Sequence, residues 1–396
     1  MSPEDIARKM TGKLEVRPGG RQAILPAPTV QNHAAFLSRL PGGRLACCWF
    51  GGTLEGKSDI SIYASVLDTE GKAWGEAEKL TDDPGRSEQN PVIFVTPAGD
   101  MLLFNTAQPA GNQDEARVFV RKLVLEEGRL VADAGRDTGL PAGTFIRAMP
   151  FVRNDGAWCL PLFRCNPRPG IRWTGAFDTA AVAVSTDEGE SWAVADVANS
   201  PGAVHMTPVA MGDGDMIALY RRRQADFVHR SESHDGGRSW SAPSPTDVPN
   251  NNSSINAVRI AGDVVAMVCN PVSAAQSAAR RASLYDELEG NDTRPEASAG
   301  CRPVWGVERA PLALCLSGDG GRTFPVRYTV EESPGTCLTN NSLDGRNKEL
   351  SYPVLLLRDD GGLDIAYTLY RRAIRHVELN AETVAALLAQ VPGRRS

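Results

Sequence analysis

The chain has 396 residues, of which 42% are hydrophobic and 23% are charged, and its formal net charge is −6. The apolar fraction is sufficient for a large core, whereas the negative balance argues against nucleic acid as a partner, because binding to phosphates needs a positive field. No apolar stretch approaches the length of a membrane-spanning helix, so we expect no membrane partner either.

The beginning of the chain, residues 1–19, is expected to be an N-terminal extension. It is charged and lacks the apolar segment of a signal peptide. The eight cysteines further along show no CxxC pair or other metal-binding spacing, and most lie in strand-like runs such as Leu314–Leu316. Buried, reduced thiols in a cytoplasmic protein are therefore expected.

One turn motif recurs along the chain, with the pattern Ser-x-Asp-x-Gly-x-x-aromatic. Complete copies begin at Ser185, Ser233 and Ser317, and a degenerate copy covers residues 67–74. Each complete copy follows a strand-like run. The Asp and Ser side chains can accept hydrogen bonds from backbone amides, and the glycine can adopt a left-handed conformation. The motif therefore predicts a hairpin turn whose aromatic residue packs beneath its own sheet.

The spacing of the motifs indicates a repeated four-stranded unit. Trp192 and Trp240 are about 48 residues apart, which fits one blade of a β-propeller. Trp74 and Trp192 are separated by about two such units, and the middle unit, residues 91–131, lacks the motif.

The later part of the chain completes the ring. The polar, irregular stretch 273–309 is interpreted as an insertion, of the kind that often serves as a functional lid. The last blade covers residues 352–379, an early strand at 22–25 is expected to close the ring with it, and residues 381–396 form a short helix and tail. The predicted fold is thus all-β, a single six-bladed β-propeller over residues 20–380.

The motif resembles the Asp box of the sialidase superfamily, and the resemblance extends over roughly residues 20–380. Bacterial BNR-repeat sialidase-like proteins are the most similar branch, on the evidence of the segments His33–Leu37, Trp49–Asp59, Asn90–Pro91, Ser351–Pro353 and Tyr367–Arg371. The resemblance implies an active site on the propeller axis. It would contain three arginines for the substrate carboxylate, an aspartic acid as general acid, and a tyrosine nucleophile activated by a glutamate.

Four of these six positions have matching residues here. The resemblance implies a general acid at Asp59, carboxylate-binding arginines at Arg221 and Arg309, and the nucleophile at Tyr352. The two other positions depart from the family pattern, because His33 stands where the first arginine is expected and His205 where the glutamate is expected. Arg147 and Glu55 are further candidates for substrate binding. Of the run Arg221–Arg223, two arginines are expected to be solvated.

The departures bear on the expected chemistry. A tyrosine with a pKa of about 10 needs a base to become a nucleophile at neutral pH, and His205 could supply one. We expect an enzyme that cleaves a glycosidic bond in a small carboxylate-bearing substrate, either uronic or sialic acid-like. Two alternatives stay open. One is a lyase that performs β-elimination on a uronate with His33 or Tyr352 as the base, and the other is a non-catalytic carbohydrate-binding propeller.

No cofactor is expected, although a structural calcium ion is compatible with the sequence. The histidines have no zinc-site spacing, and His376 is expected at the surface of the closing strand. The sequence leaves the oligomeric state open.

Overall fold

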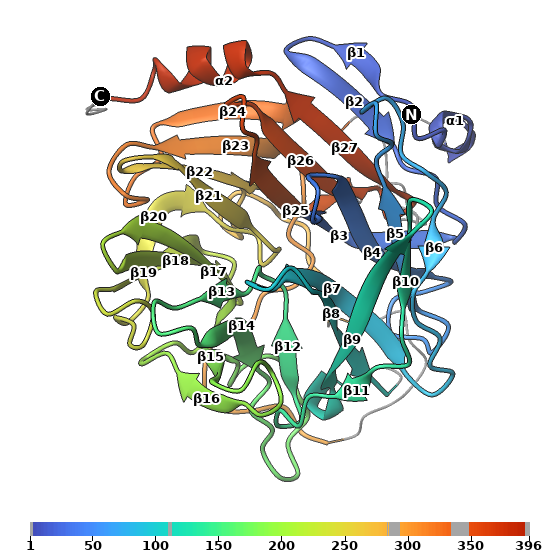
Figure 1. The fold of residues 1–396 in the computed structure, drawn as a ribbon. Coiled ribbons are helices and arrows are strands. Elements are labelled where there is room, and N and C mark those ends of the chain that lie inside the picture. Colours follow the sequence, from blue (N-terminus) through green and yellow to red (C-terminus); the bar gives the residue numbers. More distant parts are fainter. Residues whose placement is uncertain (1–2, 110–112, 283, 285–293, 334–347, 393–396) are drawn as a thin grey trace.

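The computed structural model describes residues 3–109, 113–282, 284, 294–333 and 348–392. Its strands form six antiparallel sheets, which stand around a central axis like the blades of a propeller (Figure 1). Consecutive strands of each sheet follow one another from the axis outward, and the N-terminal strands complete the outer edge of the sixth sheet. The six-bladed β-propeller predicted from the repeated turn motif is therefore confirmed.

The first three blades follow one another along the chain. Blade 1 consists of β3 (Gln31–Arg39), β4 (Leu45–Gly52), β5 (Ser61–Val66) and β6 (Glu78–Lys79). Blade 2 consists of β7 (Ser87–Val95), β8 (Met101–Gln108), β9 (Arg117–Glu126), β10 (Arg129–Ala132) and β11 (Arg136–Asp137). Blade 3 consists of β12 (Thr144–Ile146), β13 (Phe151–Val152), β14 (Trp158–Arg164), β15 (Thr179–Ser185) and β16 (Ala193–Asp196).

The remaining blades include the closing sheet. Blade 4 consists of β17 (Ala203–Gly212), β18 (Asp215–Arg222), β19 (Phe227–Ser233) and β20 (Ser244–Pro249). Blade 5 consists of β21 (Asn256–Ala261), β22 (Val264–Cys269), β23 (Leu312–Ser317) and β24 (Val326–Glu331). Blade 6 combines β25 (Leu350–Leu357), β26 (Leu363–Leu369) and β27 (Ala373–Leu379) with the N-terminal strands β2 (Gly20–Ile24) and β1 (Glu15–Arg17).

The ring closes through blade 6, where β2 pairs with β27 in antiparallel register from Gly20 opposite Leu379 to Ile24 opposite Arg375. This is the pairing predicted for the early strand. β1 extends the same sheet, so the blade begins at Glu15. In the part of the chain that the structure describes, three short helices accompany the blades, namely α1 (Pro3–Lys9), η1 (Gln113–Glu115) and α2 (Ala381–Leu388). Within the described ranges, no helix has the length and apolar character needed to cross a membrane.

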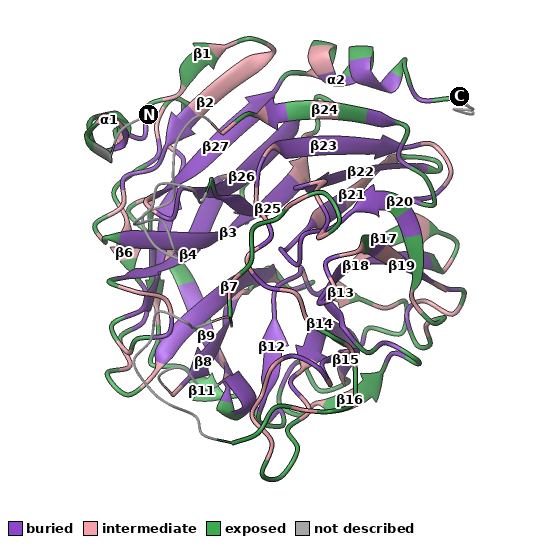
Figure 2. Cartoon of the chain, turned by 180° about the vertical axis from the view of Figure 1, so that it is seen from behind, coloured by how far each residue is buried: buried purple, intermediate pink, exposed green. Residues whose placement is uncertain are grey.

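The core lies between adjacent blades, because both faces of the inner strands are covered. All residues of β4 are buried, and so is every residue of β5, β22 and β23. The outer strand β16 is mostly exposed, and Figure 2 shows the change from buried inner strands to this exposed rim. All seven cysteines of the described part are free thiols and six of them are buried, while Cys337 lies outside the described residues.

The repeated turn motifs have the hydrogen bonds that their residue types predict. Asp319 accepts from the backbone N–H groups of Arg322 and Thr323, each at 3.0 Å, and the N–H of Gly321 donates to the hydroxyl oxygen of Ser317 at 2.8 Å. The φ angle of Gly321 is +78°, in the left-handed region that favours glycine. In the degenerate copy, Asp68 accepts the equivalent backbone bonds.

The turn of blade 5 offers a test of this role. Asp319→Ala removes an ionised acceptor of two backbone N–H groups, and we expect it to lower the free energy of unfolding by about 1 kcal/mol, because the turn is largely in contact with solvent. Urea titration measures the change. Asp359→Ala, at an exposed acid of another turn, is the control, and an equal loss in both variants would contradict the role of the motif.

Candidate active site

Four of the innermost strands carry the same irregularity near their first residues. Pairing shifts occur after His33 in β3, Gln89 in β7, Val204 in β17 and Ser351 in β25. In each case the next residue has a positive φ, and these residues are Ala34, Asn90, His205 and Tyr352, with φ of 61°, 50°, 51° and 50°. Because such bulges redirect side chains, and because strained backbone of this kind clusters at functional sites, we call this end of the axis the mouth and place the candidate site there.

Tyr352 is the centre of the residues gathered at the mouth. Its phenol oxygen accepts a hydrogen bond from Nη1 of Arg221 at 2.7 Å. The guanidinium carbons of Arg147, Arg221 and Arg309 lie 5.4, 5.8 and 5.7 Å from the centroid of its ring. The imidazole rings of His33 and His205 lie 4.3 and 5.5 Å from the same centroid. Five of the other seven residues singled out in the sequence therefore meet around the ring of Tyr352.

Arg147 makes contacts other than those expected of a substrate-binding residue. Its Nη2 donates to the backbone carbonyls of Ala35 at 2.7 Å and of Tyr352 at 2.9 Å, both within the bulges of β3 and β25. Burial lowers the pKa of Arg147 to about 10, so it stays a cation at pH 7. The geometry indicates that Arg147 holds the strained backbone of Tyr352 in place.

The three consecutive arginines of blade 4 are all buried, with exposed fractions of 1%, 8% and 1% for Arg221, Arg222 and Arg223, so the expectation that two of them are solvated is wrong. Each has its own partners. Nε of Arg221 donates to Oδ1 of Asn252 at 2.8 Å, and Arg222 donates to the carbonyl of Pro201 at 2.9 Å. Arg223 forms an ion pair with the buried Asp178 at 2.6 Å.

Glu349 is a buried carboxylate of the mouth that the sequence did not single out. Oε1 of Glu349 accepts from Nη1 of Arg309 at 2.8 Å, and Oε2 accepts from Nε of Arg371 at 3.1 Å. Burial alone would raise the pKa of Glu349, but the Arg371 and Arg309 guanidinium groups hold it well below its ordinary value. Glu349 is therefore ionised, and it fixes the position of Arg309.

The two acids of the loop between β4 and β5 have different surroundings. Glu55 forms an ion pair with Arg371 and so joins the cluster around Glu349. Asp59, the predicted general acid, is exposed, and its Oδ2 accepts from the backbone N–H of Thr53 at 3.0 Å. The loop thus contacts the site through Glu55. Asp59 stabilises the loop itself, because its carboxylate accepts a backbone hydrogen bond from Thr53, six residues earlier.

The two histidines of the site are neutral at pH 7. Burial is the main reason that the pKa of His33 lies well below 6.5, with Arg371 adding to it and Glu349 opposing it. Burial also lowers the pKa of His205, followed by the positive charges of Arg221 and Arg223. Nδ1 of His33 lies 2.8 Å from the hydroxyl of Thr368, whereas Nδ1 of His205 is buried without a hydrogen-bond partner among the described residues.

Three residues of the site escape detection in the sequence: Glu349, Arg371 and Asn252. Arg371 does belong to the segment 367–371 that carries the family resemblance, but nothing in the sequence assigns it a role. Glu349 lies just three positions before Tyr352. The role of Glu349 becomes apparent only from its contacts with Arg309 and Arg371, which come from other parts of the chain.

A second cluster of ionisable residues lies between blades 1 and 6, on the strands β26 and β27. Asp364, His376 and Glu378 have ligand atoms within 4.8 Å of one another, and His376 is fully buried, so its predicted surface position is wrong. The indole N–H of Trp74 donates to Nδ1 of His376, so Nε2 must carry the proton that is shared with Asp364. His376 therefore has no free lone pair for a metal ion.

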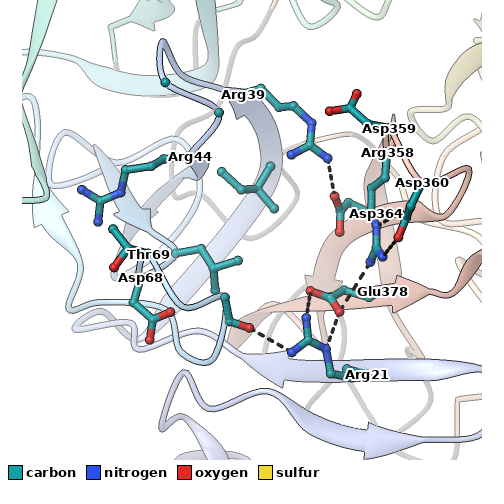
Figure 3. A pocket seen from close by; sticks show the side chains of 15 residues that line it. Arg21, Arg39, Arg44, Asp68, Thr69, Arg358, Asp359, Asp360, Asp364 and Glu378 are labelled. Carbon is teal, nitrogen blue, oxygen red and sulfur yellow. Dashed lines mark hydrogen bonds and ion pairs between the residues drawn. The ribbon is translucent and has the colours of Figure 1, made fainter.

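The polar cleft beside this cluster has a volume of about 610 Å³ (Figure 3). Its charges are mostly paired with one another. Arg39 bonds to Asp364 at 3.1 Å, and Arg21 bonds to Glu378 at 2.6 Å. These arginines neutralise the carboxylates that would have to bind a cation, and the arrangement is that of a structural ion-pair network.

The buried carboxylate at the mouth generates a prediction about stability. Glu349→Gln leaves the Arg309 and Arg371 cations without their shared counter-ion, and we expect it to lower the free energy of unfolding at pH 7 by about 3–5 kcal/mol, as for other broken buried ion pairs. The pKa of Glu349 is depressed in the folded protein. The stabilisation is therefore fully present above the unfolded pKa of about 4.3 and is lost as pH falls further toward the folded value.

Urea titrations between pH 7 and pH 3 measure the difference in unfolding free energy between the unmodified protein and Glu349→Gln. This difference should become smaller in the acid range. Glu70→Gln removes an exposed ion pair with Lys72 and should leave the unfolding free energy nearly unchanged. If the difference in unfolding free energy between Glu349→Gln and the unmodified protein stays constant over this pH range, the assignment of Glu349 as an ionised group is contradicted.

Solved structures of known proteins share this architecture. A Hadza microbial sialidase, Hz136, superposes with a TM-score of 0.66 at 11% identity, over 89% of this chain and 66% of that one, so the chain spans slightly less than two thirds of its length. A Dyadobacter fermentans protein of unknown function gives a TM-score of 0.64 at 12% identity, over 92% and 100% of the two chains. A mutant of the NanB sialidase from Streptococcus pneumoniae gives 0.63 at 11% identity, over 97% and 73%.

At these identities the structural similarity shows the fold alone. A search among curated protein sequences gives no significant match. The model of one sequence family, described as the BNR repeat-like domain, matches residues 43–365, which is most of the propeller. The repeated turns, the six blades and this match agree, and the chain belongs to the BNR repeat-like domain family.

Proposed function

We propose that the chain is an enzyme that cleaves a glycosidic bond in a small carboxylate-bearing sugar, of the uronic or sialic acid type. The observation that carries this proposal is the contact between Arg221 and the phenol oxygen of Tyr352 within a cluster rich in guanidinium groups. The sialidase-like fold and the family resemblance support a glycosidase. The substrate class rests on the charges of the mouth.

The cations of the mouth outnumber its acids. Arg309 and Arg371 share Glu349, and Arg371 also pairs with Glu55. Among the described residues, neither Arg147 nor Arg221 forms an ion pair with a carboxylate, and burial lowers the pKa of each to about 10. A guanidinium group matches the geometry of a carboxylate, so an acidic ligand would compensate the buried charge.

The proposed reaction uses Tyr352 as the nucleophile. Its oxygen forms a bond to the anomeric carbon as the bond from that carbon to the leaving oxygen breaks, and the phenolic proton passes to the neutral His205 beside it. Arg221, already bonded to this oxygen, stabilises the negative charge that develops there. In this proposal Asp59, four residues after Glu55 on the loop that joins the cluster, protonates the leaving oxygen. Water then attacks the anomeric carbon and gives a proton to Asp59, while His205 returns its proton to the oxygen of Tyr352 as the sugar departs.

Elimination from a uronate is the second candidate, and the neutral His33 favours it. Its Nε2 is buried without a hydrogen-bond partner among the described residues, and its ring lies against Tyr352. In this reaction the arginines neutralise the substrate carboxylate and acidify the adjacent C–H. An imidazole then removes that proton, and an acid protonates the departing oxygen.

A product-resolved screen of uronic and sialic acid glycosides tests the proposal. Hydrolysis should release a sugar with a new reducing end and no new double bond. Elimination would instead yield an unsaturated acid that absorbs ultraviolet light, and a purely binding propeller would yield no product.

Asp59→Asn should lower kcat by about 10²–10⁴-fold if Asp59 is the general acid. Asp82→Asn, at an exposed acid of the same blade, is the control, and equal rates in both variants would rule out this role.

The carboxylate requirement is tested separately at Arg221. Arg221→Lys keeps the charge but loses the planar fork, and we expect it to weaken binding of an acidic substrate by about 1.5–3 kcal/mol, or roughly 10- to 100-fold in KM. The KM of the methyl ester of the same substrate should change little, because the ester has no carboxylate for the clamp to bind. Arg222→Lys is the matched control because its guanidinium bonds to Pro201 away from Tyr352. An unchanged KM for acidic substrates would refute the clamp.

A further inference from the structure

The segment 294–309, which we call the mouth strap, is the described C-terminal part of the predicted insertion. It is held by backbone hydrogen bonds to blades 3 and 4. The carbonyl of Pro295 accepts from Arg172 and the N–H of Cys301 donates to Ala176, both at 2.9 Å. The N–H of Val304 donates to the carbonyl of Arg223 at 2.7 Å. The strap is thus attached directly beside the run of arginines at the end of β18.

One side chain connects the mouth strap to the proposed carboxylate-binding arginine. Nδ2 of Asn252 donates to the carbonyl of Val304 at 2.9 Å, and Oδ1 of the same amide accepts from Nε of Arg221 at 2.8 Å. Asn252 is 2% exposed and has a φ of +56°. A primary amide is a side chain that offers a donor and an acceptor in one rigid plane, so it can transmit the position of the strap to the guanidinium.

The place of the strap itself is fixed by an aromatic enclosure around Arg223. The guanidinium carbon of Arg223 lies 5.0 Å from the ring centroid of Trp305, in the strap, and 5.7 and 5.2 Å from those of Trp173 and Phe163. The same guanidinium is paired with the fully buried Asp178. A cation enclosed by aromatic rings and a carboxylate is a strong anchor, because both its charge and its flat faces are satisfied.

The strap ends at the second arginine of the proposed clamp. Arg309 is the last residue of the segment, and its Nη1 bonds to Glu349 at 2.8 Å. One stretch of chain therefore orients Arg221 from outside, through Val304 and Asn252, and carries Arg309 five residues later. The relative position of the two guanidinium groups depends on how this stretch lies against blades 3 and 4.

We propose that Asn252 is a positioning residue, through which the mouth strap sets the orientation of Arg221 relative to Arg309 for binding a sugar carboxylate. This inference rests on the proposed function for its ligand, though the coupling of strap and arginine stands on the contacts themselves. The neighbouring Asn251 provides a matched comparison. Its Nδ2 donates to the carbonyl of Glu308, also in the strap, while its Oδ1 accepts from the backbone N–H of Ser253 in place of an arginine.

The experiment compares the full chain with its Asn252→Gly and Asn251→Gly variants. Glycine adopts positive φ without strain, so the first substitution removes both amide bonds without a conformational cost in the folded state. D-Glucuronic acid and its methyl ester serve as calorimetric probes. We expect Asn252→Gly to weaken binding of the acid at least about 10-fold, with the ester and the Asn251→Gly variant little affected.

A second readout needs no ligand. Nitrogen-15 NMR follows solvent exchange of the Arg221 Nε–H, which the amide of Asn252 protects; exchange should accelerate in Asn252→Gly and not in Asn251→Gly. The unmodified chain could bind neither probe while exchange of the Arg221 Nε–H is still faster in Asn252→Gly than in the unmodified chain. In that case the positioning role stands and the proposed function fails. Unchanged exchange in Asn252→Gly, or equal weakening of acid binding in both variants, overturns the inference.

Discussion

The mouth holds four guanidinium groups, three of them buried and one largely buried, beside two carboxylates. A cation removed from water is stable only when other groups replace its hydration. The groups are those of Arg147, Arg221, Arg309 and Arg371, with Glu55 and Glu349. The two carboxylates serve Arg309 and Arg371. The other two arginines depend on weaker acceptors, namely backbone carbonyls for Arg147 and an amide and a phenol for Arg221. The proposed preference for an acidic ligand rests on this shortage of negative charge.

Several of these contacts join different blades, so the complete site exists only in the closed ring. Arg147 follows β12 of blade 3 but bonds to the bulged backbone of blades 1 and 6. Arg221 belongs to blade 4 and bonds to Tyr352 of blade 6. The bulges free the carbonyls and turn Tyr352 and His205 away from regular strand geometry, at a cost that the surrounding packing must offset. The β2–β27 pairing that closes the ring is thereby also a condition for the site.

The sequence was sufficient for the fold, because the Asp-box turns are local: Ser317, Asp319 and Gly321 lie within five positions, and their hydrogen bonds follow from residue type. The residues around Tyr352 could be proposed from the family resemblance, since the innermost strands of a propeller face a shared axis. Asp59 shows the limit of that reasoning. Its place in the chain matches the family pattern, yet its hydrogen bond to Thr53 depends on the local path of the loop.

Charge pairing across blades was beyond the sequence for a different reason. Glu349, Arg309 and Arg371 are far apart or unremarkable in the chain. Glu349 and Arg371 meet at one end of the β25–β26 pair of blade 6, and Arg309 reaches Glu349 from the segment before β23 of blade 5. The burial of Arg222 and Arg223 was missed in the same way, because consecutive arginines in an open strand would be solvated. Here Asp178 and the mouth strap cover Arg223 from outside the blade that carries it.

The shortage of negative charge also affects the two neutral histidines. The pKa of His205 is lowered first by burial and then by Arg221 and Arg223, and Arg371 contributes in the same way at His33. A bound carboxylate would offset part of this positive field but none of the burial. The imidazoles would then accept a proton more readily in the complex than in the free protein. An acidic ligand would thus increase the basicity of the groups proposed to act on it, and a neutral analogue held in the same place would not.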